Sequence, residues 1–129
     1  MNARTGQPKT CLIAESDLFI AKLLVRYAEA SGLVCIQAKE GDAILPLARE
    51  LKPDVIIQDV EFPGEMLGWE TLRALKASEE TRHIRLISCS WMIEPEVRSL
   101  VGELDGYLQK PDITYTDFEK IMRMAGIIE

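Results

Sequence analysis

Short apolar runs that alternate with segments of helical periodicity limit this chain to one kind of fold. The apolar runs span residues 10–14, 33–36, 55–57, 84–89 and 106–109. After each run, apolar residues recur at the three- and four-residue spacing of an amphipathic helix. Strands and helices that alternate in this way form a parallel sheet with helices on both faces, and right-handed crossovers leave few topologies. We therefore expect an α/β fold with a doubly wound, five-stranded parallel sheet.

Capping residues, glycine and proline predict where the helices begin and end. The expected helices span about residues 18–30, 42–51, 69–78, 95–101 and 116–125. Ser16 or Asp17 can cap the first helix. Thr116 and Glu119 have the form of a capping box for the last helix. A helix tolerates proline only in or near its first turn, so Pro46 predicts a late start or a kink in the second helix.

The composition favours one acidic globular domain. The chain has 129 residues, a net charge of −6 and a hydrophobic share of 47%, which suffices for a single core. The negative charge argues against binding nucleic acid or an anionic membrane through the whole surface. No apolar run approaches the roughly 18 residues that span a bilayer. We predict a flexible lead-in over residues 1–9, a single domain over residues 10–129 and, without a signal peptide, a cytoplasmic location.

The cysteines are predicted to be structural. Cys11, Cys35 and Cys89 each lie inside an apolar run, without C-x-x-C spacing and away from His83. This pattern favours buried reduced thiols over zinc ligands.

Polar side chains follow four of the five predicted strands. The candidates are Glu15, Ser16 and Asp17 after the first strand, Asp59 after the third, Ser90 after the fourth and Lys110 after the fifth. Parallel strands end at the same edge of a sheet, so these side chains are expected to meet. Carboxylates suit Mg²⁺, an ammonium and a hydroxyl can bind phosphoryl oxygens, and a carboxylate can attack phosphorus. Each residue alone has an ordinary alternative as a turn residue or a helix cap, but the set indicates phosphoryl chemistry.

The motifs at these strand ends resemble those of response-regulator receiver domains, the phospho-accepting modules of two-component signalling. The resemblance covers about residues 10–125. Its motifs are LIAESD at 12–17, PDVIIQD at 53–59 with Pro63 four residues later, ISCS at 87–90 and GYLQKP at 106–111. The last motif is the most specific of the four. The resemblance implies a receiver, or flavodoxin-like, sheet with strand order 2-1-3-4-5 and five helices.

The resemblance also implies a role for each residue. Asp59 would accept the phosphoryl group and Lys110 would pair with it. Ser90 would be the switch hydroxyl, and Tyr107 the aromatic side chain that moves when Ser90 binds the phosphoryl group. The ligands of Mg²⁺ would be Glu15, Asp59 and the backbone carbonyl of Glu61.

Two positions depart from the family pattern. Ser16 stands where the family has a second acid, and a hydroxyl is a poorer ligand for Mg²⁺ than a carboxylate. Weak Mg²⁺ binding is therefore expected, with Asp17 or the side chain of Glu61 as the available replacement. Trp91 follows the switch hydroxyl, where the family has a small residue. A bulky ring there is expected to cover the acyl phosphate or to block the phosphodonor.

The resemblance implies two kinds of partner. A histidine kinase or a phosphotransfer protein would donate the phosphoryl group. A downstream protein would bind the face formed by the helix 95–101, the strand 106–109 and the helix 116–125. Unless the chain is a fragment of a longer protein, output is expected through protein contact, by a monomer or weak dimer, without direct contact to nucleic acid or membrane.

Two other functions stay open. Ser16 and Trp91 favour a pseudo-receiver, a docking module that keeps the fold but is not efficiently phosphorylated. A small phosphatase that forms an aspartyl-phosphate would need a general acid, for which Glu61 is the candidate, and a substrate lid, which the sequence does not show. We therefore expect no enzyme activity beyond self-catalysed phosphoryl transfer.

Overall fold

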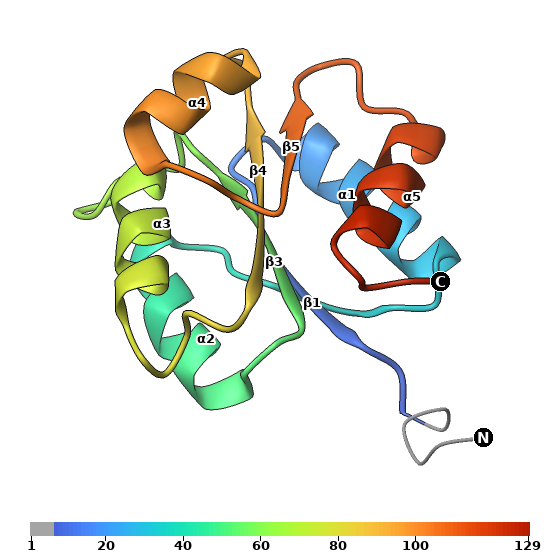
Figure 1. The fold of residues 1–129 in the computed structure, drawn as a ribbon, viewed down its shortest axis with the longest axis horizontal. Coiled ribbons are helices and arrows are strands. Elements are labelled where there is room, and N and C mark those ends of the chain that lie inside the picture. Colours follow the sequence, from blue (N-terminus) through green and yellow to red (C-terminus); the bar gives the residue numbers. More distant parts are fainter. Residues whose placement is uncertain (1–6) are drawn as a thin grey trace.

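A parallel sheet between two layers of helices makes up the fold in the computed structural model, which describes residues 7–129 (Figure 1). In chain order the elements are β1 Thr10–Ala14, α1 Leu18–Ala30, β2 Val34–Gln37, the 3₁₀ turn η2 Gly41–Ala43, α2 Ile44–Leu51, β3 Val55–Asp59, α3 Gly68–Ala77, β4 Arg85–Ser90, α4 Glu94–Val101, β5 Gly106–Gln109 and α5 Tyr115–Met124. Helices α1 and α5 cover one face of the sheet, and α2, α3 and α4 cover the other (Figure 1).

All strand pairs of the sheet are parallel, in the order β2-β1-β3-β4-β5. The expected fold class and strand order are therefore confirmed. Strand β3 lies at the centre, and every one of its residues is buried. Ile57 of β3 pairs with Ile13 of β1 and with Ile87 of β4.

Two apolar clusters hold the helices to the sheet. Successive residues of a strand point to opposite faces, and β3 shows the consequence. Ile57 packs in the cluster under α1 and α5, together with Phe118. Ile56 packs in the cluster under α2, α3 and α4, together with Leu72. Burial on both faces explains why β3 begins with the continuous apolar run of residues 55–57.

The second helix starts late, as Pro46 predicted. The 3₁₀ turn η2 precedes α2, and Pro46 is the third residue of the α-helix that begins at Ile44. The missing N–H of proline costs nothing there, because the first N–H groups of a helix have no partner within it.

The predicted caps have mixed outcomes. Asp17 caps α1, and its carboxylate accepts a hydrogen bond from the backbone N–H of Ile20 at 3.0 Å. The capping box predicted at Thr116 is wrong. The N-cap of α5 is Thr114, whose hydroxyl accepts from the N–H of Asp117 at 3.0 Å while Asp117 accepts from Thr114. Thr114 and Asp117 have the same three-residue spacing as the predicted pair, Thr116 and Glu119, but lie two residues earlier in the chain.

Strand β2 begins one residue later than predicted. Leu33 belongs instead to the turn that closes α1, where its N–H donates to the carbonyl of Ala28 at 2.9 Å. Gly32 makes this closure possible with a φ of 83°, in the left-handed region that favours glycine.

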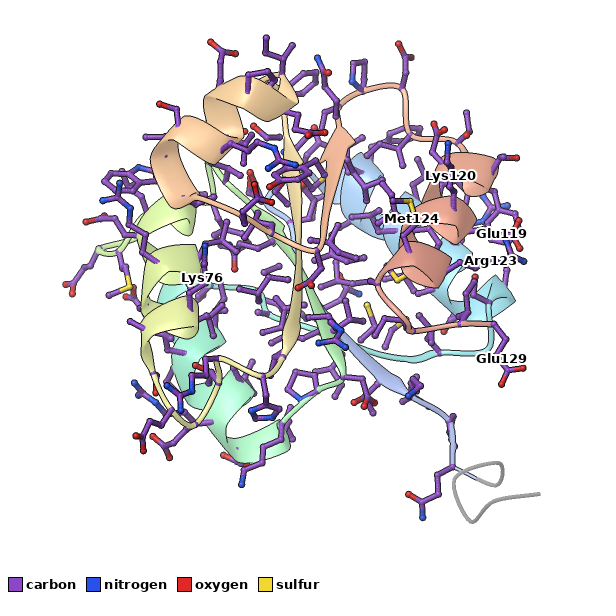
Figure 2. All side chains as sticks on the ribbon, in the orientation of Figure 1. Lys76, Glu119, Lys120, Arg123, Met124 and Glu129 are labelled. Carbon is purple, nitrogen blue, oxygen red and sulfur yellow. The ribbon has the colours of Figure 1, made fainter. Side chains whose placement is uncertain are left out.

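A lysine ties two helices of one layer together. Lys76 of α3, labelled in Figure 2, donates to the carbonyl oxygens of Val101 at 2.9 Å and Glu103 at 2.8 Å. The first carbonyl belongs to the last residue of α4, where backbone acceptors lack helical partners, and the second lies in the loop that follows. The ammonium therefore satisfies them and fixes α4 against α3.

The cysteines are free thiols. Cys11 and Cys89 are fully buried and Cys35 is partly buried. Burial raises the pKa of Cys35 to about 11, and it raises the pKa values of the other two further. All three are therefore protonated at neutral pH and pack as small apolar side chains.

None of the helices in residues 7–129 is long and apolar enough to cross a membrane. Of the predicted lead-in over residues 1–9, residues 1–6 lie outside the described part of the chain.

Candidate functional site

The candidate residues gather at the edge of the sheet where β1, β3, β4 and β5 end. The N–H of Lys110 donates to the carbonyl of Ser90 at 2.8 Å, which extends the pairing of β4 and β5 beyond the last strand residue. The N–H of Val60 donates to Cys89 at 3.1 Å and does the same for β3 and β4. The backbone thus places Asp59, Ser90 and Lys110 side by side.

The carboxylate of Asp59 is fully buried and has donors on both oxygens. Oδ1 accepts from the N–H of Glu61 at 2.9 Å and lies 3.3 Å from Nζ of Lys110. Oδ2 accepts from the hydroxyl of Ser16 at 2.5 Å and from its N–H at 3.2 Å. These four donors replace the water that the carboxylate loses on burial.

The Gln58 side chain and the start of α3 contact the backbone carbonyl of Asp59. Gln58 donates its side-chain N–H to the carbonyl of Asp59 at 3.0 Å. Helix α3 begins directly against this carbonyl, since a Cβ on Gly68 would lie 2.0 Å from it and 2.7 Å from the carbonyl of Val60. Only glycine leaves room for so close an approach of two backbone segments.

Lys110 and Glu15 form a buried ion pair beside Asp59. Nζ of Lys110 lies 3.0 Å from Oε2 of Glu15, and both side chains are at most 2% exposed. Oε2 also accepts from the N–H of Asp17 at 2.8 Å. One ammonium therefore faces two carboxyl groups.

The pKa values of the pair reflect this arrangement. Burial raises the pKa of Glu15, while the N–H of Asp17 and the contact with Lys110 act in the opposite direction. Burial lowers the pKa of Lys110, but the hydrogen bond to Glu15 and the attraction of Asp59 and Glu15 outweigh it, so the pKa is raised overall. Lys110 is thus a permanent cation at neutral pH.

Ser90 and Glu61 are joined directly. The hydroxyl of Ser90 donates to Oε2 of Glu61 at 2.6 Å and accepts from the N–H of Met92 at 2.9 Å. Oε1 of Glu61 accepts from the N–H of Trp91 at 3.4 Å. The sequence did not predict this pair, although a glutamate two residues after Asp59 is visible in it.

The two aromatic candidates lie on different sides of the site. The ring of Trp91 is 54% exposed, and Nζ of Lys110 lies 5.6 Å from its centre. Tyr107 is partly buried under Arg98, and its hydroxyl is bound to the loop after α4, where it accepts from the N–H of Leu104 at 2.9 Å. Trp91 therefore flanks the charged cluster, while Tyr107 is anchored away from it.

Few oxygen atoms of the site are available to a divalent cation. Oε1 of Glu15 is buried without a hydrogen-bond partner, which leaves it available to a cation. Asp59 and the backbone carbonyl of Glu61 lie in the same strand end. The side chain of Asp17 caps α1 instead, and that of Glu61 binds Ser90. Within residues 7–129 no group of three or more His, Cys, Asp or Glu side chains is arranged to hold a metal.

Comparisons with known proteins agree with this geometry. The family model described as the response regulator receiver domain matches residues 11–122. The polar-differentiation response regulator DivK of Brucella anthropi is 37% identical over 106 residues, which are 81% of this chain and 85% of that protein.

Solved structures with the same fold include the chemotaxis response regulator CheY4 of Vibrio cholerae, with a TM-score of 0.79 and 23% identity over 92% of this chain and 99% of that one. The receiver domain of the sensor histidine kinase PA1611 of Pseudomonas aeruginosa, solved with magnesium coordinated in its active-site cleft, has a TM-score of 0.79 at 18% identity and covers 92% of this chain and 98% of that one. The chain belongs to the response-regulator receiver family, the receiver module of two-component systems.

Proposed function

We propose that this receiver accepts a phosphoryl group on Asp59 from a histidine kinase or a phosphotransfer protein and thereby changes a protein-binding face. The observation that carries the proposal is the contact of 3.3 Å between the buried Asp59 carboxylate and Nζ of Lys110. A buried acid with a fixed cation beside it can take up a phosphoryl group while the added negative charge stays compensated.

In the transfer, a carboxylate oxygen of Asp59 forms a bond to phosphorus as the bond from phosphorus to the donor nitrogen breaks. The leaving imidazole keeps the electron pair of that bond and takes up a proton. Oδ2 is the oxygen that can be freed at the smaller cost, because the Ser16 hydroxyl that covers it can rotate. Lys110 stays on Oδ1 and neutralises charge on the product. The protein promotes its own modification and turns over no substrate, so we do not class it as an enzyme.

A magnesium ion belongs to this proposal. Glu15, Asp59 and the carbonyl of Glu61 would hold it, with water completing its shell. When bound, it would neutralise charge on the phosphoryl oxygens. With Ser16 in place of a third carboxylate, the affinity is expected to be low.

The proposed output surface is the face of α4, β5 and α5. A hollow of about 520 Å³ lies there, and its lining includes Arg98, Tyr107 and, from α5, Lys120 and Met124. Figure 2 labels the two α5 residues. Tyr107 belongs to β5, whose next strand residues lead to Lys110. A shift at the site can therefore reach this face through one short strand. The proposal includes a monomer or weak dimer in the cytoplasm, where the three thiols stay reduced.

One observation favours a second candidate, the docking module that is not efficiently phosphorylated. The hydroxyl of Ser16 lies 2.5 Å from Oδ2 of Asp59 and supplies the stabilisation that a cation would otherwise provide. A site satisfied by its own donors has less need of a metal, and without a metal the transfer is slow.

Phosphorylation by acetyl phosphate, followed by intact-mass analysis, separates the two candidates. We expect a single phosphoryl adduct in the presence of Mg²⁺, absent in Asp59→Asn and retained in Asp42→Asn. Asp42 is a matched control because it is an exposed aspartate that does not belong to the cluster. An adduct that persists in Asp59→Asn refutes the site, and no adduct in the unmodified protein favours the docking module.

A further inference from the structure

We infer that the carboxylate of Glu61 is a built-in anion that holds the switch hydroxyl of Ser90 and the amide of Trp91 before any phosphoryl group arrives. Glu61 is thus a positioning residue whose side chain an incoming phosphoryl group has to displace. The second half of this inference rests on the proposed function, whereas the first half concerns the unmodified protein alone.

The backbone fixes Glu61 at the site. Its N–H donates to Oδ1 of Asp59 at 2.9 Å, so the main chain of the residue is bound to the proposed acceptor. From this anchor the side chain reaches the end of β4. Oε2 accepts from the hydroxyl of Ser90 at 2.6 Å, and Oε1 accepts from the N–H of Trp91 at 3.4 Å. Both oxygens of one carboxylate therefore bind two consecutive residues of β4 and its following loop.

The hydrogen of the Ser90 hydroxyl is committed to Glu61. A serine hydroxyl has one hydrogen to donate and two lone pairs that accept. One lone pair of Ser90 accepts from the N–H of Met92 at 2.9 Å, and the hydrogen points to Oε2 of Glu61. A hydrogen bond of 2.6 Å to a carboxylate oxygen is short. Ser90 cannot donate to a phosphoryl oxygen until this bond breaks.

Charge makes the exchange of partners favourable. A phosphoryl group on Asp59 adds up to two negative charges. The carboxylate of Glu61 is nearby, because the N–H of Glu61 is bound to Asp59. Like charges at short distance repel, and Glu61 is an exposed residue with a route into solvent. The modified protein therefore lowers its energy when Glu61 leaves Ser90 and the hydroxyl turns to the phosphoryl group.

This arrangement differs from a switch whose hydroxyl is free in the resting state. Here Ser90 is already held by an anion, and the loop from Trp91 to Met92 is already fixed through it. Phosphorylation then exchanges the Glu61 carboxylate for the phosphoryl group as the acceptor of the hydrogen bond from Ser90. The loop after β4 changes because the two anions differ in position and charge.

The test compares Glu61→Ala and Glu61→Gln with Glu65→Ala, all with Trp69→Phe so that Trp91 is the sole indole. Glu65 is a matched control because it is an exposed glutamate in the loop that follows Glu61. In amide proton–nitrogen spectra of the unmodified protein, we expect the signals of Trp91 and Met92 to move in Glu61→Ala, to move less in Glu61→Gln, which keeps an acceptor, and to stay in place in Glu65→Ala. Signals that move no further in Glu61→Ala than in Glu65→Ala overturn the inference.

A second readout tests the displacement. In Glu61→Ala the initial rate of phosphorylation by acetyl phosphate should rise roughly two- to fivefold, the effect of removing one exposed like charge, whereas Glu65→Ala should keep the original rate. A rate that is unchanged or lower in Glu61→Ala refutes displacement. If the unmodified protein forms no adduct at all, the proposed function fails, and the amide spectra still decide whether Glu61 holds Ser90 and Trp91.

Discussion

Replacing Lys110 by methionine removes the cation from a buried group of three charges and should be among the most destabilising single changes in this protein. The ammonium lies 3.0 Å from Glu15 and 3.3 Å from Asp59. At an effective dielectric constant of 20, the two attractions amount to roughly 5 kcal/mol each before desolvation is subtracted. Desolvation of the lysine offsets much of this gain, but the variant keeps two carboxylates without a counter-charge. Breaking a buried pair in this way costs about 3–5 kcal/mol.

The assay is urea unfolding at pH 7.5, followed by circular dichroism. With a denaturant dependence of about 2 kcal/mol per molar urea, the midpoint should fall by roughly 1.5–2.5 M. Lys22→Met is the matched control, because Lys22 is exposed on α1, and its midpoint should stay within about 0.3 M of the original. A loss below roughly 1 kcal/mol in Lys110→Met would refute the picture of a cation that both carboxylates need.

The pH dependence of the same variants gives an independent check. The folded-state pKa of Lys110 is raised above its value of 10.5 in the unfolded chain, so the lysine contributes stability below that pH and loses it as the pH rises through the folded-state pKa. Unmodified protein should therefore lose stability above pH 10.5 more steeply than Lys110→Met. For Glu15 the raised pKa means that the folded state holds its proton more tightly. Protonation of Glu15 should therefore make the protein more stable as the pH falls from neutral toward 4.5. Glu15→Gln should reduce this dependence of the unfolding free energy on pH.

Three further changes test the site and its support. Ser16→Asp adds a carboxylate next to Asp59 and should raise the affinity for Mg²⁺ about tenfold or more, measured by titration of tryptophan fluorescence; an unchanged affinity would mean that the metal does not sit there. Gly68→Ala places a methyl group 2.0 Å from the carbonyl of Asp59 and should cost about 3 kcal/mol or more of unfolding free energy, and a stability within 1 kcal/mol of the original would contradict the close approach. Thr114→Ala should destabilise the protein by about 1 kcal/mol through loss of the α5 cap, whereas Thr116→Ala should have an effect below about 0.5 kcal/mol; equal losses would contradict the assigned cap.

The order of strands and helices was predictable from the spacing of apolar residues. This spacing reflects which side chains of each strand or helix are buried in the fold. Residues 55–57 form a continuous apolar run because both faces of β3 are covered. The late start of α2 was predictable from Pro46, since proline has one allowed place in a helix. The cap of α5 was not, because Thr114 and Thr116 both precede an acid by three residues. Which of the two threonines caps α5 depends on where the turn after β5 ends and the helix begins.

The membership of the site was more predictable than its internal contacts. Strand ends bring Glu15, Asp59 and Lys110 together for reasons of topology, and the sequence shows where the strands end. Side-chain rotamers are not visible in this way. Glu61 was considered for its backbone carbonyl and as an alternative metal ligand, yet its carboxylate binds Ser90. Ser16 was read as the loss of a metal ligand, while the structure shows it also as a donor to Asp59.

The ion pair of Glu15 and Lys110 joins residues that lie 95 positions apart, and this separation has a consequence for the order of folding. During synthesis β1 and β3 are available long before β5, so both carboxylates exist in a growing chain that still lacks their cation. Burying them at that stage would leave two like charges without compensation. The centre of the sheet can therefore close stably only after the last strand has been added. A chain that ends before β5 lacks Lys110, so its folded state would be less stable. Such a chain should be more susceptible to proteolysis.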